Sequence, residues 1–407
     1  MVTANHGVCS PLVPLVPCDI GLENLTQFPE GRRVWTCIQC GTCAGTCPYG
    51  EMMQYPPRRI IGMLSAGELD KVFNSDSLLN CVACYACTAK CPRAIDLTGI
   101  LLPLVKEQVL MHLSQVPAEL QKALENTLRH GNPMGESPRK RVAWVKTAGV
   151  PIRILPEDPR PVDVLWFVEC YSAYHPRGQD NARATAKILN ALGVDFAILG
   201  NEEKCAGECS RLSGEPGLFN SLMEYNMLVL GKYKFNVMVT SCPHAYDAFH
   251  YRYRVLGFNY DLLHIVPFLA KHVDRLKPML KGKANYKVTY HDSCCLGRHN
   301  HLYEEPRRVL QALPGVKLVE MVHNRLNTMC CGGGGGGMWL DTYYKTKGNE
   351  RLSERRIKEA VATGADVLAV ACPYEISRFE DALKVLGYEK KMVVRDIVEL
   401  LADAMEA

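Results

Sequence analysis

The sequence has no apolar run long enough to cross a membrane. The nearest candidate, residues 97–105, is short and contains Pro103, whereas a membrane helix needs about 18 consecutive apolar residues. The first six residues lack the basic head and the apolar core of a secretory signal. We therefore expect a cytoplasmic protein without a membrane span, which contacts a membrane only through a partner subunit.

Charge of neither sign dominates the chain, which has 47 basic and 43 acidic residues and a net charge of +4. This mild and mixed charge gives no reason to expect nucleic acid as a partner. The sequence also lacks a P-loop, a G-x-G-x-x-G motif between a strand and a helix, and a flavin fingerprint. We expect neither a nucleotide nor a flavin on this chain, so that any flavin lies on another subunit.

Cysteine, in contrast, is abundant, with 19 residues in a chain of 407. Eight cysteines form two runs with the spacing C-x2-C-x2-C-x3-C-P: Cys37, Cys40, Cys43 and Cys47 in the first run, and Cys81, Cys84, Cys87 and Cys91 in the second. Two-cluster ferredoxins hold [4Fe–4S] clusters with this spacing. Zinc does not need two such runs, and the spacing is too tight for strain-free disulfides. The runs therefore predict iron–sulfur clusters and electron transfer.

The ligands of the two clusters follow from the same pattern, because the fourth cysteine of each run reaches the other cluster. We expect the first cluster on Cys37, Cys40, Cys43 and Cys91, and the second on Cys81, Cys84, Cys87 and Cys47. Helix-like spacing at residues 57–64, 68–73 and 99–113 predicts a mainly helical ferredoxin-like domain over residues 31–112. We interpret residues 1–30 as an N-terminal arm and residues 113–160, rich in Pro, Gly and charge, as a linker that includes the basic stretch 139–141.

From residue 161 onward, short apolar runs alternate with helical segments. Strands are expected at residues 162–168, 194–199, 237–240, 287–290, 316–321 and 365–371, and helices at 181–192, 218–233, 304–313 and 342–362. This alternation predicts a parallel sheet with crossover helices. The whole chain is thus expected to be an α+β multidomain protein, in which a helical cluster domain precedes an α/β domain.

The cysteines of this second part repeat. Cys170, Cys205 and Cys242 recur 124, 125 and 130 residues later as Cys294, Cys330 and Cys372. We infer a duplication, with a first cysteine-rich half at residues 161–285 (half 1) and a second at 286–407 (half 2). Each cysteine follows the carboxyl end of an expected strand, which is where parallel α/β sheets bind ligands. Each half therefore gathers several thiols at one point.

These residues carry a family resemblance. Half 2 contains Cys330-Cys331-Gly332-Gly333, a glycine run to Gly337, Cys294 in the string His291-Asp292-Ser293-Cys294-Cys295-Leu296-Gly297-Arg298-His299-Asn300, and Cys372-Pro373. It resembles the duplicated CCG cysteine-rich domain of heterodisulfide-reductase-type iron–sulfur proteins, and residues 31–112 resemble the ferredoxin partner of that domain. The resemblance covers residues 31–407.

The resemblance implies an iron–sulfur electron-transfer subunit of a soluble multi-subunit oxidoreductase. It would relay electrons between a flavoprotein subunit and a terminal acceptor or donor subunit, for example in an electron-bifurcating or acyl/aryl-CoA redox complex. Two alternatives stay open: a catalytic disulfide reductase with its active-site cluster in half 2, and the iron–sulfur subunit of a 2-hydroxy-acid oxidase or flavoprotein–quinone oxidoreductase. A cluster-bearing regulator ranks below these. The sequence assigns no catalytic residue.

The chain departs from the family pattern in both halves. Family members can hold a noncubane cluster on five cysteines, but half 1 has Ala206 and Ala245 and half 2 has Glu375 at positions where the motif carries cysteine. Four thiols remain in each half, the number that one cubane requires. We expect a third cluster on Cys294, Cys330, Cys331 and Cys372. A fourth on Cys170, Cys205, Cys209 and Cys242 competes with a degenerate site without metal. Cys9, Cys18 and Cys295 stay unassigned, with Cys295 a candidate fifth thiolate for the reductase alternative.

Other residues near these cysteines have two interpretations. His244, His291, His299 and His301 could move protons, but we expect mainly local hydrogen bonds. Arg298 could offset cluster charge, and Glu375 is either a carboxylate ligand or a filler of the lost position. The glycine run at 332–337 is expected to pass close to a cluster, with N–H groups aimed at its sulfurs.

Overall fold

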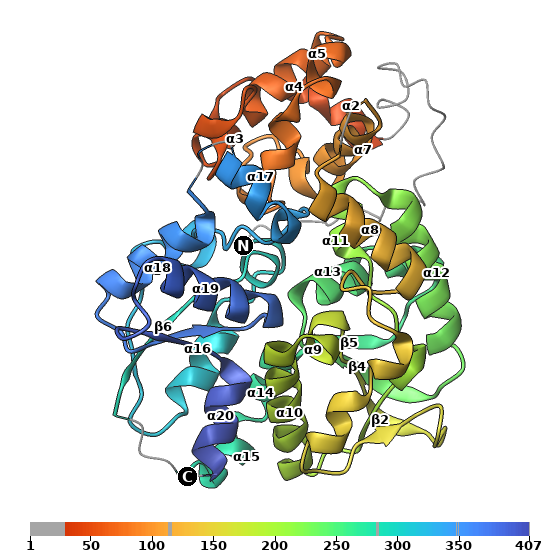
Figure 1. Cartoon of the computed structure of the whole chain (residues 1–407), viewed down its shortest axis with the longest axis vertical. Coiled ribbons are helices and arrows are strands. Elements are labelled where there is room, and N and C mark those ends of the chain that lie inside the picture. The colour runs from red at the N-terminus through yellow and green to blue at the C-terminus, as the bar shows by residue number, and fades with distance from the viewer. Residues whose placement is uncertain (1–28, 113–115, 282–284, 347, 349, 407) are drawn as a thin grey trace.

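The computed structural model describes residues 29–112, 116–281, 285–346, 348 and 350–406. Cys9, Cys18 and nearly all of the expected N-terminal arm lie outside these residues. Figure 1 shows three parts, a helical part at one end of the molecule and two α/β units that lie side by side below it. The structure is thus a mixture of helices and two parallel sheets.

The described residues before position 153 form helices and no strand. The α-helices are α2 (Pro29–Arg32), α3 (Thr42–Gly45), α4 (Pro57–Ser65), α5 (Leu69–Phe73), α6 (Ala86–Ala89), α7 (Leu102–His112) and α8 (Ala118–His130). Helix α4 begins with Pro57 in the first turn, where the missing N–H costs nothing, and buries Ile60, Ile61 and Leu64. A π-helical turn, η4 (Leu97–Leu101), leads into α7. The helices expected at 57–64, 68–73 and 99–113 are confirmed within a few residues.

Half 1 contains a five-stranded sheet in the order β1-β3-β2-β4-β5, and all of its pairs are parallel. Its strands are β1 (Arg153–Ile154), β2 (Val162–Phe167), β3 (Phe196–Ile198), β4 (Phe235–Thr240) and β5 (Asp261–His264). In the register of the central strand, Val164 pairs with Phe196 on one side and with Val237 on the other. The helices are α9 (Cys170–Tyr174), α10 (Pro176–Ala191), α11 (Glu208–Ser213), α12 (Pro216–Leu230), α13 (Pro243–Tyr251), α14 (Ile265–Lys271) and α15 (Val273–Leu276).

Half 2 repeats this plan with a four-stranded parallel sheet in the order β7-β6-β8-β9. Its strands are β6 (Lys287–Tyr290), β7 (Lys317–Leu318), β8 (Val367–Val370) and β9 (Val393–Asp396), and its α-helices are α16 (Glu304–Gln311), α17 (Asp341–Thr346), α18 (Leu352–Ala362), α19 (Pro373–Val385) and α20 (Ile397–Glu406). A π-helical turn, η10, covers Cys295–His299. The order β7-β6-β8-β9 matches β3-β2-β4-β5 of half 1, strand for strand. This is the arrangement that a duplicated unit requires.

Short 3-10 segments complete the described helical structure: Arg33–Thr36, Gly50–Met52, Asp76–Asn80, Pro138–Lys140, Ala143–Thr147, Gly200–Glu202, Tyr253–Leu256, Lys277–Met279, Arg325–Asn327 and Gly337–Trp339. Two of them, with α8 and β1, lie in the segment that the sequence suggested was a linker. That segment also buries Trp144 and the side chain of Arg141, so it packs as part of the folded protein. Its Pro, Gly and charged residues concealed this in the sequence.

Buried side chains join the three parts. One hydrophobic cluster includes Trp166 and Val239 of half 1 together with Val288 and Tyr290 of half 2. In the same contact region, α10 packs on α20 (Figure 1). A second cluster combines residues of the helical part with residues of half 2: Tyr49, Val82, Tyr85 and Leu120 with Tyr344, Leu352 and Ile357. Apolar burial therefore fixes the cysteine runs against half 2.

Two other expectations differ from the structure. The helix expected at 342–362 is instead two helices, α17 and α18, and the strands β5 and β9 were not expected. Both strands are four residues long and carry charged residues, such as Asp261 and Arg395. Each lies at an edge of its sheet, where one side is not covered by a neighbouring strand and the apolar pattern is weaker.

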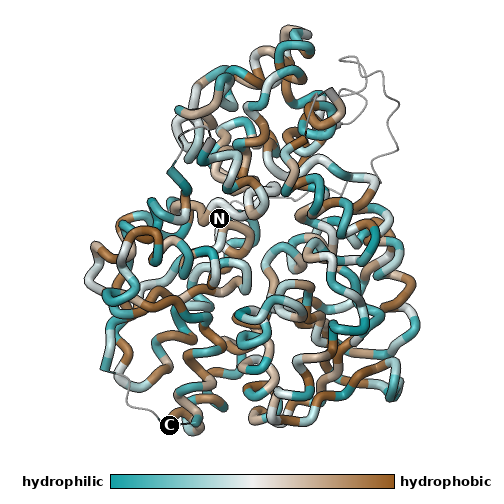
Figure 2. Tube along the Cα trace, in the orientation of Figure 1, coloured by the Kyte–Doolittle hydropathy of each residue, from teal (hydrophilic) through white to brown (hydrophobic). Residues whose placement is uncertain are grey.

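Hydropathy along the chain agrees with the absence of a long apolar run. In Figure 2 brown and teal segments alternate throughout all three parts. Among the described residues, no helix is long and apolar enough to span a bilayer.

A buried histidine makes stability depend on pH. His264 is fully buried at the start of α14; its Nδ1 accepts the N–H of Val266 at 3.2 Å and its Nε2 donates to the Ser241 carbonyl at 3.0 Å. Burial lowers the pKa of His264 from 6.5 to about 3. Below pH 6.5 the unfolded chain binds a proton that the folded protein excludes. This residue therefore lowers the free energy of unfolding by about 1.4 kcal/mol for each unit by which the pH decreases. Thermal unfolding of the anaerobic protein from pH 7.5 down to about 5.5 should show the loss.

The matched variant is His264→Asn, whose side-chain oxygen can still accept the Val266 N–H but does not titrate. Its Tm should respond less to pH than that of the unsubstituted protein. Identical pH dependence in the two proteins would show that His264 does not carry the effect.

Candidate iron–sulfur sites

The four thiols expected for the first cluster gather around one cavity. Its lining includes Cys37, Cys40, Cys43 and Cys91, together with Arg58 and Arg93. The loop between the cysteines bends at Gly41, whose φ of 84° suits glycine. The Gln39 N–H and amide side chain both point at the Cys37 sulfur, at 3.4 and 3.5 Å. Of the four thiols, only Cys40 is exposed. We call this group the cluster 1 site.

The thiols expected for the second cluster form another group, the cluster 2 site, which is more deeply buried. Burial, followed by the charges of Cys84 and Cys81, raises the pKa of Cys47, and burial followed by Cys84 raises the pKa of Cys87. The charges that act most strongly on Cys47 and Cys87 thus come from the other thiols of this site. The exchange of fourth cysteines between the runs is therefore compatible with the fold, since Cys91 lies with the first run and Cys47 with the second.

Half 2 forms a third group of thiols after its strands, the half-2 site: Cys294, Cys295, Cys330, Cys331 and Cys372. Cys294, Cys295, Cys330 and Cys331 belong to one buried cluster, in which the Cys294 thiol lies near those of Cys295 and Cys330, and the Cys330 thiol lies near that of Cys331. Backbone N–H groups of the glycine run point at two of the sulfurs, Gly332 at Cys330 (3.2 Å) and Gly333 at Cys331 (3.4 Å). Cys372 is the N-cap of α19 and precedes Pro373 at its first turn, a position where proline is preorganised for a helix.

The half-2 site touches the second cysteine run. The Cys84 and Cys330 thiols lie near each other in one buried cluster, and their interaction is the main reason that the pKa of Cys84 falls to about 7. Arg298 crosses the same junction, because its guanidinium donates to the carbonyl oxygens of Cys84 (2.6 Å), Leu326 (3.1 Å) and Thr328. It is 4% exposed. A buried cation therefore lies between two groups of thiols that each carry negative charge when they bind metal.

The glycine run explains how the two segments come so close. A Cβ at Gly334 would lie 2.5 Å from the Val82 carbonyl oxygen, and one at Gly335 would lie 2.5 Å from the Cys81 carbonyl oxygen. Lys106 of α7 donates to the carbonyls of both Cys81 (3.1 Å) and Gly335 (2.6 Å). Glycine is thus needed for backbone-to-backbone contact with the second cysteine run, which is a more specific role than passing near a cluster.

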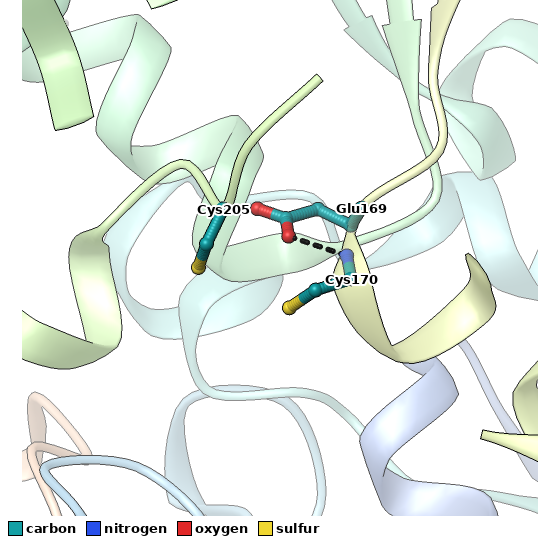
Figure 3. A group of neighbouring side chains, drawn as sticks. All are labelled: Glu169, Cys170 and Cys205. Carbon is teal, nitrogen blue, oxygen red and sulfur yellow. Dashed lines mark hydrogen bonds between the residues drawn. The ribbon is translucent and has the colours of Figure 1, made fainter. Parts of the chain in front are cut away.

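Half 1 brings its four expected thiols together as well, in the half-1 site. The Cys170 and Cys205 sulfurs lie within 4.8 Å of each other, and burial followed by the charges of Cys242 and Cys170 raises the pKa of Cys209. Figure 3 shows the Cys170 and Cys205 sulfurs beside Glu169. Both oxygens of Glu169 accept backbone N–H groups, from Cys170 at 2.8 Å and Ala206 at 3.0 Å. This carboxylate therefore organises the two loops that carry the cysteines.

The half-1 and half-2 sites lie beside each other. The pKa of Cys372 is raised by burial, then by the charges of Glu375, Cys242 and Cys331, so Cys372 is near thiols of both halves. The Tyr374 hydroxyl lies 3.6 Å from the Cys170 sulfur. The two cysteine sites of the duplicated halves therefore lie where half 1 and half 2 meet.

The side chains at all four sites fit iron–sulfur clusters. The 17 cysteines among the described residues carry free thiols, and four or more converge at each site, as a cubane requires. Backbone N–H groups at the sulfurs and the buried cations Arg298 and Lys106 favour an anionic cluster. Burial raises the pKa of most of these thiols, so metal must displace their protons to bind.

Comparisons with known proteins agree with this geometry. Residues 164–246 and 288–374 each match the family described as "Cysteine-rich domain" (CCG), and residues 36–96 match the family described as "4Fe-4S dicluster domain". The first two ranges contain the half-1 and half-2 cysteines, and the third contains both cysteine runs. The two CCG matches confirm the duplication.

Among curated relatives, one subunit of the dihydromethanophenazine:CoB--CoM heterodisulfide reductase of Methanosarcina barkeri is 30% identical over 95% of this chain and 97% of its own length. The chain belongs to the family of this heterodisulfide reductase subunit. The "EtfAB:quinone oxidoreductase" of Syntrophomonas wolfei is 32% identical over 95% of the chain, and the "Probable iron-sulfur-binding oxidoreductase FadF" of Bacillus subtilis is 34% identical over 82%. The chain spans only 60% and 47% of the lengths of these two relatives.

The chain is therefore an iron–sulfur protein of the heterodisulfide reductase type. Two of the histidines near the cysteines, His299 and His301, have local partners. The His299 Nδ1–H donates to Asp247 Oδ1 at 2.5 Å, and its ring stacks on the rings of Tyr85 (4.0 Å) and Tyr251 (4.3 Å). This supports local bonding for His299, and His301 likewise contacts Tyr303 through its ring.

Sequence reasoning missed several residues that shape the sites of this heterodisulfide-reductase-type protein. Glu169, Lys106 and Asp247 are buried charged side chains that contact the cysteine loops or their neighbours. Each comes from an element that is distant in sequence from at least one of its partners. No motif marked them, and burial of the charge was visible only in the fold.

Proposed function

We propose that the chain is an electron-transfer subunit in which the two ferredoxin clusters pass electrons to or from the half-2 site. The observation that carries the proposal is the contact between Cys84 of the cluster 2 site and Cys330 of the half-2 site. Iron–sulfur clusters supply one-electron carriers. The polypeptide supplies a short path between them, since apolar packing holds the second cysteine run against half 2.

The arrangement favours an order along this path. Cys40 of the cluster 1 site is exposed, whereas Cys84, Cys330 and Cys331 are buried. An external partner can therefore approach cluster 1 most closely, and the cluster 2 site lies between cluster 1 and half 2. Arg298 and Lys106 would stabilise the reduced, more negative state of the buried clusters.

The partners and the localisation belong to the same proposal. The name of one relative, "EtfAB:quinone oxidoreductase", includes EtfAB and a quinone, and the sequence resemblance implies a flavoprotein partner for this chain. The heterodisulfide reductase relatives support membership of a multi-subunit complex. We propose a flavoprotein donor, a cytoplasmic site of action and no flavin on the described domains. An electron-bifurcating or acyl/aryl-CoA complex remains an expectation from the sequence.

Iron and acid-labile sulfide in anaerobically purified protein test the proposal. We expect about 12 iron atoms per chain for the two ferredoxin clusters and the half-2 site, and about 16 if the half-1 site is also loaded. Stepwise reduction by dithionite, followed by EPR, should reveal more than two interacting centres. About eight iron atoms would restrict the clusters to the ferredoxin part and contradict a path into half 2.

A catalytic disulfide reductase is the second candidate, favoured by the buried free thiol of Cys295, which lies beside the expected ligand Cys294. Turnover of a disulfide with reduced viologen by the isolated chain would support it. The absence of turnover in protein with a full iron complement would favour the electron-transfer role.

A further inference from the structure

A buried carboxylate oxygen beside the half-2 site lacks a partner. Glu375 of α19 is 2% exposed, and its Oε2 has no hydrogen-bond partner. The Ser293 hydroxyl and the Cys331 thiol lie beside the carboxyl group, and Oε1 lies 3.3 Å from His291 Nε2. An unpartnered buried carboxylate is costly unless it is paired or coordinates a metal. The Oε2 atom of Glu375 is therefore available to bind a cation.

Ligand atoms of three different chemistries meet at this point. Atoms of His291, Cys331 and Glu375 lie within 4.8 Å of one another, and all three residues are buried. Iron accepts thiolate, imidazole and carboxylate ligands. The group is therefore a candidate metal-binding set that includes one of the cysteines expected to hold the third cluster.

The hydrogen bonds of His291 indicate which of the two residues, His291 or Glu375, can bind metal. The Arg356 Nε donates to His291 Nδ1 at 3.0 Å, and arginine can only donate. His291 Nδ1 is therefore the unprotonated nitrogen, and Nε2 carries the proton of the neutral ring. An Nε2–H faces Glu375 as a donor and has no free lone pair for a metal. Glu375 is thus the ligand, and His291 orients it.

The other half of the molecule provides an internal comparison. The position equivalent to His291, three residues before the first cysteine of the half, is Phe167 in half 1. The position equivalent to Glu375, three residues after the last cysteine, is Ala245 in half 1. The acidic residue of the half-1 site, Glu169, has both oxygens occupied by backbone N–H groups. Only half 2, within the described residues, combines the thiols with a carboxylate oxygen that lacks a partner.

We propose that Glu375 supplies an oxygen ligand to an iron of the half-2 site, next to Cys331, and that the His291 Nε2–H orients the carboxylate. The inference rests on the proposed function, because it requires iron in half 2. An iron with an oxygen ligand differs electronically from neighbours that have thiolate and sulfide ligands only. The half-2 site would then contain one distinct iron, while the two ferredoxin clusters have thiolate ligands throughout.

Mössbauer spectra of protein enriched in 57Fe test the proposal, with iron and sulfide analysis on the same samples. The unsubstituted protein should show a minority subsite with a larger isomer shift than the sulfur-ligated iron. In Glu375→Cys the iron content should persist while that subsite takes on sulfur-ligated parameters. In Glu375→Gln the subsite should change or be lost. The control Glu380→Gln lies on the same helix, at a partly exposed carboxylate bound to Arg177, and should preserve the spectrum.

The outcomes separate this inference from the proposed function. Unsubstituted protein without iron in half 2 would contradict the proposed function. If half 2 contains iron and neither Glu375→Gln nor Glu375→Cys changes the spectrum of the unsubstituted protein, only the oxygen ligand would be contradicted. His291 is a positioning residue. His291→Gln keeps an N–H donor and should retain the subsite, whereas His291→Leu should broaden the signal of the subsite at unchanged iron content. Equal spectra in the two variants would contradict a role for His291.

Discussion

Replacement of Gly334 by alanine is expected to destabilise the protein and to separate the half-2 site from the second cysteine run. The new methyl group would lie 2.5 Å from the Val82 carbonyl oxygen, and neither backbone can move without disturbing the Cys81 and Cys330 loops. Such overpacking typically costs about 1–3 kcal/mol. We expect a lower Tm for the anaerobic protein, together with slower electron transfer into half 2, because the Cys84–Cys330 contact depends on this docking.

The matched control is Gly333→Ala in the same loop. There the added methyl would meet the flexible Met338 side chain first, with its sulfur at 3.2 Å, and the Gly333 N–H that points at Cys331 would be retained. Its Tm should stay close to that of the unsubstituted protein. If the two variants melted at the same temperature with the same electron-transfer rate, backbone docking of the glycine run would not be what holds the two sites together.

Replacement of Cys87 by serine is expected to interrupt electron flow through the chain. Cys87 is a buried member of the cluster 2 site, and loss of its thiolate should remove about four iron atoms per chain. Cluster 1 would then have no neighbour between it and half 2. The measurement is freeze-quench EPR after mixing with a reductant that reacts at the exposed cluster. In the variant, cluster 1 should be reduced while the half-2 site stays oxidised. In the unsubstituted protein, both should be reduced on the same time scale.

Two comparisons sharpen this experiment. Cys18→Ser changes a cysteine outside the expected ligand sets and should leave the iron content unchanged. Cys91→Ser should perturb the same EPR signal as Cys40→Ser, since Cys91 lines the cavity of the first run. A signal shared by Cys91 and Cys87 variants, and not by Cys40, would instead assign each cluster to a single run. Continued reduction of half 2 in Cys87→Ser at the normal rate would contradict cluster 2 as the intermediate.

The sequence was most informative where the pattern is local. The C-x2-C-x2-C-x3-C-P spacing and the helix of residues 57–64 depend on contacts within a few residues, so both were recognisable directly. The parallel strands of half 1 and half 2 were predicted for a similar reason, because central strands such as β2 and β4 are mainly apolar and largely buried. Edge strands β5 and β9 lack that burial and were missed.

The sites were predictable only in part. The sequence predicted that the thiols of each half lie near the ends of its strands. In the fold Cys170 and Cys205 lie within 4.8 Å of each other, and the charges of Cys242 and Cys170 affect the pKa of Cys209. The neighbours of the thiols could not be predicted. Lys106 reaches Gly335 across 229 residues and Arg298 reaches Cys84 across 214, and such long-range pairs leave no periodic trace in a single sequence.

The amino-acid sequence by itself determined the chemistry of this protein, because the number and spacing of its cysteines suit iron–sulfur clusters and the duplication repeats their positions. Tertiary structure alone decided which sites adjoin. The contact of Cys84 with Cys330 and the unpartnered oxygen of Glu375 both arise from packing between segments far apart in the chain. The physical reason is that ligand type is a property of single residues, whereas burial and proximity are properties of the assembled core.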